Sequence, residues 1–161
     1  MRSKQKIETD ILEGKTWYKV PSYTVMLVRD KKIETDTKFI NSPDDVNKIL
    51  QSYLNGVDRE HFVVILLNRK NGIIGINTVS VGDLSTSIVH PREVFKPAIV
   101  AGAASIIVAH NHPSGDPAPS RDDINVTTRL KEAGDILGIN VLDHIIIGDG
   151  CYISLKARDL L

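Results

Sequence analysis

Apolar residues occur along the chain in short blocks whose spacing alternates between that of strands and that of helices. Continuous apolar runs such as 61–68 and 104–110 are typical of buried strands. The helical blocks instead place apolar residues three or four positions apart. The strand blocks are 22–30, 61–68, 73–81, 104–110, 139–148 and 151–155, and the helical blocks are 42–54, 90–103 and 120–138.

Turn and capping residues mark where these blocks begin and end. Asn71-Gly72 and Asp149-Gly150 are typical of hairpin turns, so each predicts that the strands on either side pair. Gly138 is expected to end the last helix. Pro97 lies inside the 90–103 block, where it predicts a late helix start or a kink because proline lacks an N–H. The helix N-cap candidates are Ser42 and Ser120.

The order hairpin, helix, strand, loop, helix, hairpin predicts an α/β fold with a mixed, mainly antiparallel β-sheet flanked by helices. The predicted domain is 42–161. Residues 1–41 are predicted to form an N-terminal arm. Within it, 1–16 is polar and without periodicity, and 22–30 is a short β-rich segment on which 31–35 pairs back.

Composition narrows the classes of function. The chain has 161 residues, 42% of them apolar, which is enough for one core. Twenty basic side chains balance twenty acidic ones, so the chain has no overall charge attraction to nucleic acid. No apolar run approaches the roughly 18 residues of a membrane span, and we expect a soluble, cytoplasmic protein. The single cysteine, Cys151, excludes an intrachain disulfide and is predicted to be a small buried residue rather than a nucleophile.

The stretch AHNHPSGDPAPSRDD, residues 109–123, combines candidate metal ligands with turn formers. His110 and His112 are two positions apart at the end of a strand, so both imidazoles face the same side. The prolines and glycine that follow force a turn, which brings Asp123 in the next helix back toward them. Two imidazoles and one carboxylate suit zinc, and three protein ligands leave a fourth position for water, as in catalytic sites.

Simpler roles for the same residues are left open by the sequence. Histidines near a turn often only hydrogen-bond to it. Ser120 and Asp123 have the spacing of a capping box, in which serine caps the helix and the acid three residues on bonds back. The joint spacing of the two histidines, the serine and the aspartate favours the functional interpretation, because such a combination seldom arises by chance.

The pattern His-x-His, seven residues, Ser, two residues, Asp resembles the signature of the JAB/MPN (JAMM) metalloproteases. The longer stretch 89–123 is similar to the bacterial RadC-type branch of that family, and the similarity extends from Ser42 to Leu161. It implies that 42–161 is a RadC-type JAB/MPN domain with a cytidine-deaminase-like fold. It also implies one Zn²⁺ per chain, held by His110, His112 and Asp123.

The resemblance assigns two catalytic roles. The serine of the motif, Ser120, is expected to hydrogen-bond the oxyanion of the reaction intermediate, although the N-cap role would use the same oxygen. A glutamate directly ahead of the first long core strand is expected to act as general base, and Glu60 matches it. Glu93 is the alternative, with a simpler role as an acid in the first turn of a helix. The other histidines are expected to be structural, with Asp143-His144 a candidate pair for supporting the ligands: His61, His90 and His144.

These features together predict a zinc-dependent hydrolase, a metallopeptidase or isopeptidase acting on a peptide or isopeptide substrate. One alternative is a DNA-associated factor with a repair or mobile-element role. The balanced charge and the lack of a helix-hairpin-helix pattern in residues 1–41 argue against it. Another alternative is a non-catalytic scaffold, which the complete ligand set argues against. Edge strands leave a homodimer open, and no membrane association is expected.

Overall fold

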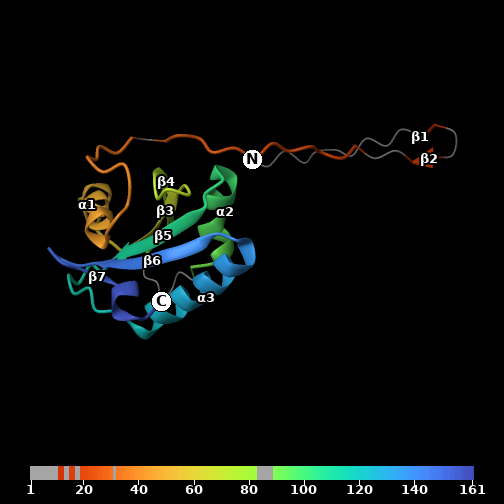
Figure 1. Cartoon of the computed structure of the whole chain (residues 1–161). Helices are drawn as coiled ribbons and strands as arrows, with labels where there is room; N and C mark the ends of the chain where they lie inside the picture. Colours follow the sequence, from red (N-terminus) through yellow and green to blue (C-terminus); the bar gives the residue numbers. More distant parts are fainter. Residues whose placement is uncertain (1–10, 13–14, 17–18, 31, 83–88) are drawn as a thin grey trace.

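The computed structural model describes residues 11–12, 15–16, 19–30, 32–82 and 89–161. Its centre is a five-stranded sheet with helices on both faces, and an N-terminal stretch extends away from it (Figure 1). Two short strands, β1 (Ile11–Leu12) and β2 (Lys15–Thr16), form a separate antiparallel pair within the N-terminal stretch.

The strands of the main sheet are β3 (His61–Leu67), β4 (Ile73–Val81), β5 (Ser105–Asn111), β6 (Asn140–Ile147) and β7 (Tyr152–Ser154). Their order across the sheet is β4-β3-β5-β6-β7. Neighbouring strands pair antiparallel except β5 and β6, which run parallel. The predicted mixed, mainly antiparallel sheet is therefore confirmed.

Among the described residues, three helices cover the sheet: α1 (Pro43–Tyr53), α2 (Pro91–Ala101) and α3 (Arg121–Leu137). The apolar side of α1 packs on one face, and α2 and α3 pack on the other (Figure 1). Successive β3 side chains point to opposite faces, so Phe62 packs with α2 and α3 whereas Val63 packs with α1. Both faces are covered, which is why β3 is apolar at consecutive positions. None of the helices in the described part of the chain is long and apolar enough to cross a membrane.

The predicted turns and caps are present. The β3–β4 hairpin turns through Asn71, which is left-handed with a φ of 57°, and the β6–β7 hairpin turns through Gly150, with a φ of 66°. Gly138 ends α3 with a φ of 68°. Ser42 caps α1 in a capping box with Asp45. A short 3₁₀ turn, η1 (Lys156–Arg158), follows β7.

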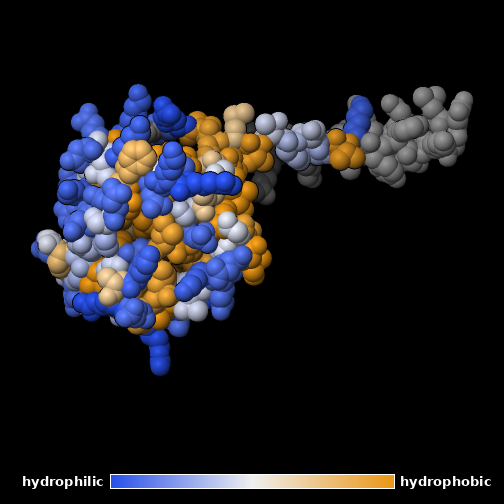
Figure 2. Space-filling model, viewed as in Figure 1, coloured by the Kyte–Doolittle hydropathy of each residue, from blue (hydrophilic) through white to orange (hydrophobic). Residues whose placement is uncertain are grey.

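The β-rich segment predicted at 22–30 is not a strand, and this prediction is wrong. Within the described residues it has no strand partner, and the side chains of Tyr23, Val25 and Val28 are 82%, 72% and 82% exposed. A two-stranded ribbon by itself is marginally stable in water, so β propensity alone did not produce one. Figure 2 shows apolar side chains at the surface where the N-terminal stretch leaves the rest of the molecule.

Two smaller expectations are also corrected. Helix α2 begins at Pro91 and continues through Pro97, so a late start is wrong. Pro91 suits the first helical position, where an N–H would have no partner in the helix; a kink at Pro97 stays a prediction. Cys151 is exposed rather than buried because it closes the turn between β6 and β7, where its carbonyl accepts a hydrogen bond from the Gly148 N–H.

Candidate metal centre

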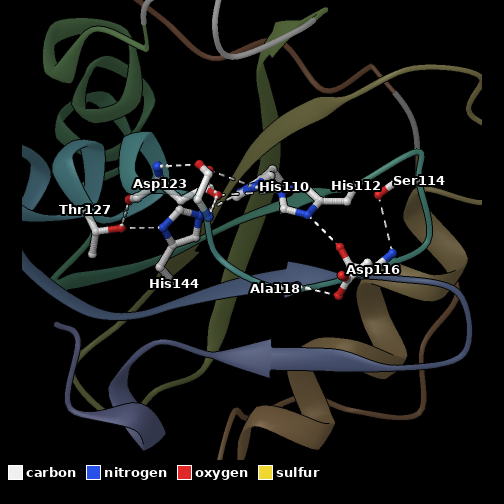
Figure 3. A network of polar contacts seen from close by, with 9 residues as sticks. His110, His112, Ser114, Asp116, Ala118, Asp123, Thr127 and His144 are labelled. Atoms are coloured by element: carbon white, nitrogen blue, oxygen red, sulfur yellow. Dashed lines mark hydrogen bonds and ion pairs between the residues drawn. The ribbon is translucent and has the colours of Figure 1, made fainter.

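Three side chains converge where β5 ends (Figure 3). His110 lies in β5, His112 follows its last residue, and Asp123 lies in the first turn of α3. The two histidine Nε2 atoms are 3.0 Å apart. Asp123 Oδ1 is 3.1 Å from His110 Nε2, and Asp123 Oδ2 is 3.6 Å from His112 Nε2. The structure therefore brings the predicted ligands together, placed to bind a metal ion.

The loop between β5 and α3 folds back because its backbone bonds to the neighbouring β6–β7 turn. The His112 N–H donates to the Ile147 carbonyl, and the Asp149 N–H donates to the Gly115 carbonyl, both at 2.8 Å. Gly115 turns the chain in the left-handed region, with a φ of 83°. The loop thus returns Asp123 to the histidines, as the turn formers predicted.

Asp123 carries a negative charge into the interior. Its side chain is 1% exposed, and Oδ2 accepts hydrogen bonds from the N–H and the hydroxyl of Ser120, both at 2.7 Å. Burial raises the pKa of Asp123, but the adjacent His110 ring and the two hydrogen bonds from Ser120 outweigh burial and lower it below its ordinary value. The carboxylate is therefore ionised at neutral pH, and a buried anion is stable only when a cation or several donors face it.

His112 directs its Nε2 atom at this centre, and its other ring nitrogen bonds to the backbone. Its Nδ1 lies 2.7 Å from the Asp116 carbonyl oxygen, which can only accept a hydrogen bond. Nδ1 therefore carries the hydrogen of the neutral ring, and Nε2 keeps its lone pair. The His112 side chain is 18% exposed, whereas those of His110 and Asp123 are at most 1% exposed, so solvent reaches the centre from the His112 side.

Ser120 occupies the N-cap position of α3, as the capping interpretation predicted. Its Oγ accepts a hydrogen bond from the Asp123 N–H at 3.1 Å and donates one to Asp123 Oδ2 at 2.7 Å. The single hydroxyl hydrogen is therefore directed at the carboxylate. The oxyanion role would require that hydrogen to turn from Asp123 toward the substrate, and it stays a prediction.

Glu60 precedes β3 directly, and its backbone is fixed beside the histidine loop. Asn111, between the two ligand histidines, accepts a hydrogen bond from the His61 N–H at 2.8 Å and donates one to the Arg59 carbonyl at 3.1 Å. The Gly82 N–H also donates to the Glu60 carbonyl at 2.8 Å. Sequence reasoning missed Asn111, because the partners of its side chain lie about fifty residues away.

The alternative base, Glu93, has the simpler role that the sequence left open, that of an acid in the first turn of a helix. It lies in the first turn of α2, with Oε2 2.6 Å from Lys96 Nζ and Oε1 3.5 Å from Arg92 Nε. The hydrogen bond from Lys96 lowers the pKa of Glu93. With 43% of its side chain exposed, Glu93 belongs to a surface ion pair.

Of the other histidines, His144 contacts a ligand: its Nε2 lies 2.8 Å from His110 Nδ1. His144 is fully buried, and burial lowers its pKa well below the ordinary value, so the ring is neutral. His61 bonds to the Arg59 carbonyl at 3.0 Å, and His90 takes the N-cap position of α2 without a side-chain cap bond.

Asp143 and Thr127 both contact His144. Asp143 accepts hydrogen bonds from the Ser154 hydroxyl at 2.6 Å, the Lys156 N–H at 3.1 Å and the His144 backbone N–H at 2.7 Å, so it holds the C-terminal turn and the backbone of His144. Thr127, which sequence reasoning missed, contacts His144 Nδ1 at 2.6 Å. Its one sequence signal is its place four residues after Asp123, on the same side of α3.

Comparison with known proteins agrees with this fold and motif. Residues 40–160 match the RadC-like JAB domain family. The chain belongs to this family. It is 61% identical over 119 residues to a UPF0758 protein of Caldanaerobacter subterraneus subsp. tengcongensis, a match that covers 74% of this chain and 51% of that protein. It is 53% identical over 132 residues to a UPF0758 protein of Shouchella clausii, a match that covers 80% of this chain and 57% of that protein. It is 59% identical over 122 residues to a UPF0758 protein of Rubrobacter xylanophilus, a match that covers 76% of this chain and 53% of that protein. The chain thus spans about half the length of these curated relatives.

A cleft of about 430 Å³ adjoins the metal centre of this RadC-like JAB domain. It is lined by Asn111 and His112 at the end of β5, by Gly115 of the loop and by Leu50 and Leu54 at the end of α1. No lysine or arginine among the described residues lines it. Phosphate backbones are bound chiefly by basic side chains.

Proposed function

We propose that this chain is a zinc-dependent hydrolase, a metallopeptidase or isopeptidase with His110, His112 and Asp123 as its metal ligands. The observation that carries the proposal is the convergence of two imidazoles and one ionised carboxylate, whose ligand atoms lie within 4.8 Å of one another. Two histidines and a carboxylate form a donor set of catalytic zinc sites, in which a fourth position remains for water or substrate.

The chemistry is divided between the metal and the chain. When bound, zinc lowers the pKa of a water ligand to about 7 and polarises the substrate carbonyl. A carboxylate oxygen of Glu60 is the proposed proton acceptor, and it returns the proton to the leaving amine. The β3–β5 register pairs Phe62 with His110, and Glu60 lies two residues before Phe62 just as His112 lies two residues after His110, which supports Glu60 as the base. Ser120 is the proposed hydrogen-bond donor to the oxyanion.

The proposed substrate is a peptide or isopeptide rather than a nucleic acid. The cleft beside His112 has no basic side chain among its described lining residues, and the chain as a whole carries no net charge. Leu50, Leu54 and Val57 give its lining apolar surface, and Gln51 and Asn55 add amide groups. Such a lining suits an extended peptide, which needs hydrogen-bond partners and apolar contacts but no counter-ions.

The assignment of the metal ligands is tested by measuring the zinc content of variants. Wild-type protein, His112→Ala, Asp123→Ala and the control His90→Ala are purified without added metal, loaded with zinc, dialysed and analysed by mass spectrometry. We expect about one zinc per wild-type and His90→Ala chain, because His90 is exposed outside the centre, and a large loss in the other two. Equal zinc in all four proteins would show that the site is not where we place it.

Hydrolysis is tested with a mixture of synthetic peptides, by counting the new amino termini that appear. Zinc-loaded wild type is expected to release them, and both chelation and Asp123→Ala should abolish the release. The same protein is titrated with a DNA duplex at low salt. Zinc-independent or absent peptide cleavage together with salt-sensitive DNA binding would favour the DNA-associated alternative.

A further inference from the structure

Behind His110, a chain of buried polar contacts runs from β5 through β6 to α3 (Figure 3). His110 Nδ1 lies 2.8 Å from His144 Nε2, and His144 Nδ1 lies 2.6 Å from Thr127 Oγ1. Thr127 Oγ1 in turn lies 2.6 Å from the backbone carbonyl of Asp123. All three side chains belong to residues with no exposed surface, so water does not compete for these bonds.

The carbonyl at the end of this chain fixes the direction of each hydrogen bond. A carbonyl oxygen only accepts, so Thr127 donates its one hydroxyl hydrogen to the backbone carbonyl of Asp123. The Thr127 oxygen must then accept from His144 Nδ1–H. Because a neutral imidazole carries one hydrogen, His144 Nε2 is an acceptor, and His110 Nδ1 must donate to it.

We propose that His144 and Thr127 are positioning residues that hold the hydrogen of His110 on Nδ1 and so keep the Nε2 lone pair free for the metal. Without them, His110 could carry its hydrogen on Nε2 and donate it to His112 Nε2 or to Asp123. That hydrogen would then take the place of the metal between the ligand atoms. With them, both Nε2 atoms face each other across 3.0 Å as acceptors. Two lone pairs at that distance repel unless a cation lies beside them. This inference rests on the proposed metal centre.

The same contacts place Asp123 relative to His110. Thr127 is one turn after Asp123 on α3, and its bond to His144 ties that turn to β6. His144 ties β6 to His110 on β5. The carboxylate and imidazole ligands are therefore joined through the protein as well as across the centre, and loss of the hydroxyl should loosen both the orientation of His110 and the position of Asp123.

Threonine variants test the proposal with a control on the same helix. Thr127→Val keeps the shape but removes the hydroxyl, and Thr127→Ser keeps the hydroxyl. Thr128→Val is the control, because the Thr128 hydroxyl makes the same bond, to the Ile124 carbonyl at 3.0 Å, but on the exposed side of α3. We expect Thr127→Val to weaken zinc binding about 10- to 100-fold, and Thr127→Ser and Thr128→Val to bind like wild type. Wild-type affinity in Thr127→Val would overturn the proposal.

A measurement on the metal-free protein separates this inference from the proposed function. Nitrogen-15 NMR of labelled histidines reports which ring nitrogen carries the hydrogen, at a pH where the rings are neutral. We expect hydrogen on Nδ1 of His110 and His144 in wild type, and loss of that preference in Thr127→Val. Hydrogen on Nε2 of His110 in wild type would refute the positioning role. If wild type bound no zinc, the proposed function would fail. The NMR result would still decide whether the chain of hydrogen bonds from His110 to Thr127 exists.

Discussion

The side chain of Asn111 joins the end of β5 to the start of β3, because its Oδ1 accepts a hydrogen bond from the His61 backbone N–H at 2.8 Å. Its amide nitrogen donates to the Arg59 carbonyl at 3.1 Å, so both neighbours of Glu60 are bonded to one residue. Asn111 itself stands between the two ligand histidines. The backbone around the proposed base is thus bonded to the strand that carries His110 and leads into His112.

Replacement of Asn111 by alanine is expected to lower turnover with little effect on zinc. The ligands remain, but residues 59–61 lose two bonds to β5, and a shift of the base of about 1 Å can cost about 100-fold in rate. Zinc content and kcat of the zinc-loaded variant are the measurements. Asn140→Ala, at an exposed position that begins β6, is the matched control. Unchanged kcat in Asn111→Ala would remove this link from the mechanism.

The charge of the proposed base is tested by Glu60→Gln. The amide keeps the size of the side chain but cannot take a proton, so we expect wild-type zinc content and a loss of about 10²- to 10⁴-fold in kcat. Glu93→Gln should stay within a few fold of wild type, because Glu93 is part of an exposed pair with Lys96. The opposite result, with full activity in Glu60→Gln and none in Glu93→Gln, would reassign the base.

The sequence predicts a strand most plainly where partners cover both of its faces. β3 shows this best: residues 62–67 are at most 3% exposed, so the run is apolar throughout and its pattern is plain. The segment 22–30 has the same β propensity but is exposed and unpaired within the described structure. Propensity describes how well side chains fit a sheet, and it carries no information on whether a neighbouring strand exists.

The residues of the candidate site also differ in how far the sequence predicts them. His110, His112 and Asp123 lie within fourteen consecutive residues, so strand alternation and turn chemistry bring them together. His144 meets His110 across a separation of 34 residues, and Asn111 meets His61 across 50. Those contacts depend on the parallel pairing of β5 with β6 and the antiparallel pairing of β5 with β3. Local patterns do not encode strand register between distant segments, so the supporting residues appear only in the fold.

The fold of the ligand loop is tested by Gly148→Ala. A methyl group at this position would collide with the Gly115 carbonyl, and would lie 2.7 Å from Pro117 Cδ and 3.0 Å from Cys151 Sγ. The loop must move to admit it, so we expect a loss of about 1–3 kcal/mol in the free energy of unfolding, together with weaker zinc binding. Gly75→Ala in β4 is the control, because a methyl group there meets no atom within 4 Å. Urea denaturation and zinc titration measure the two effects. If Gly148→Ala matched Gly75→Ala in both, the packing of this loop against the β6–β7 turn would not be what holds the ligands together.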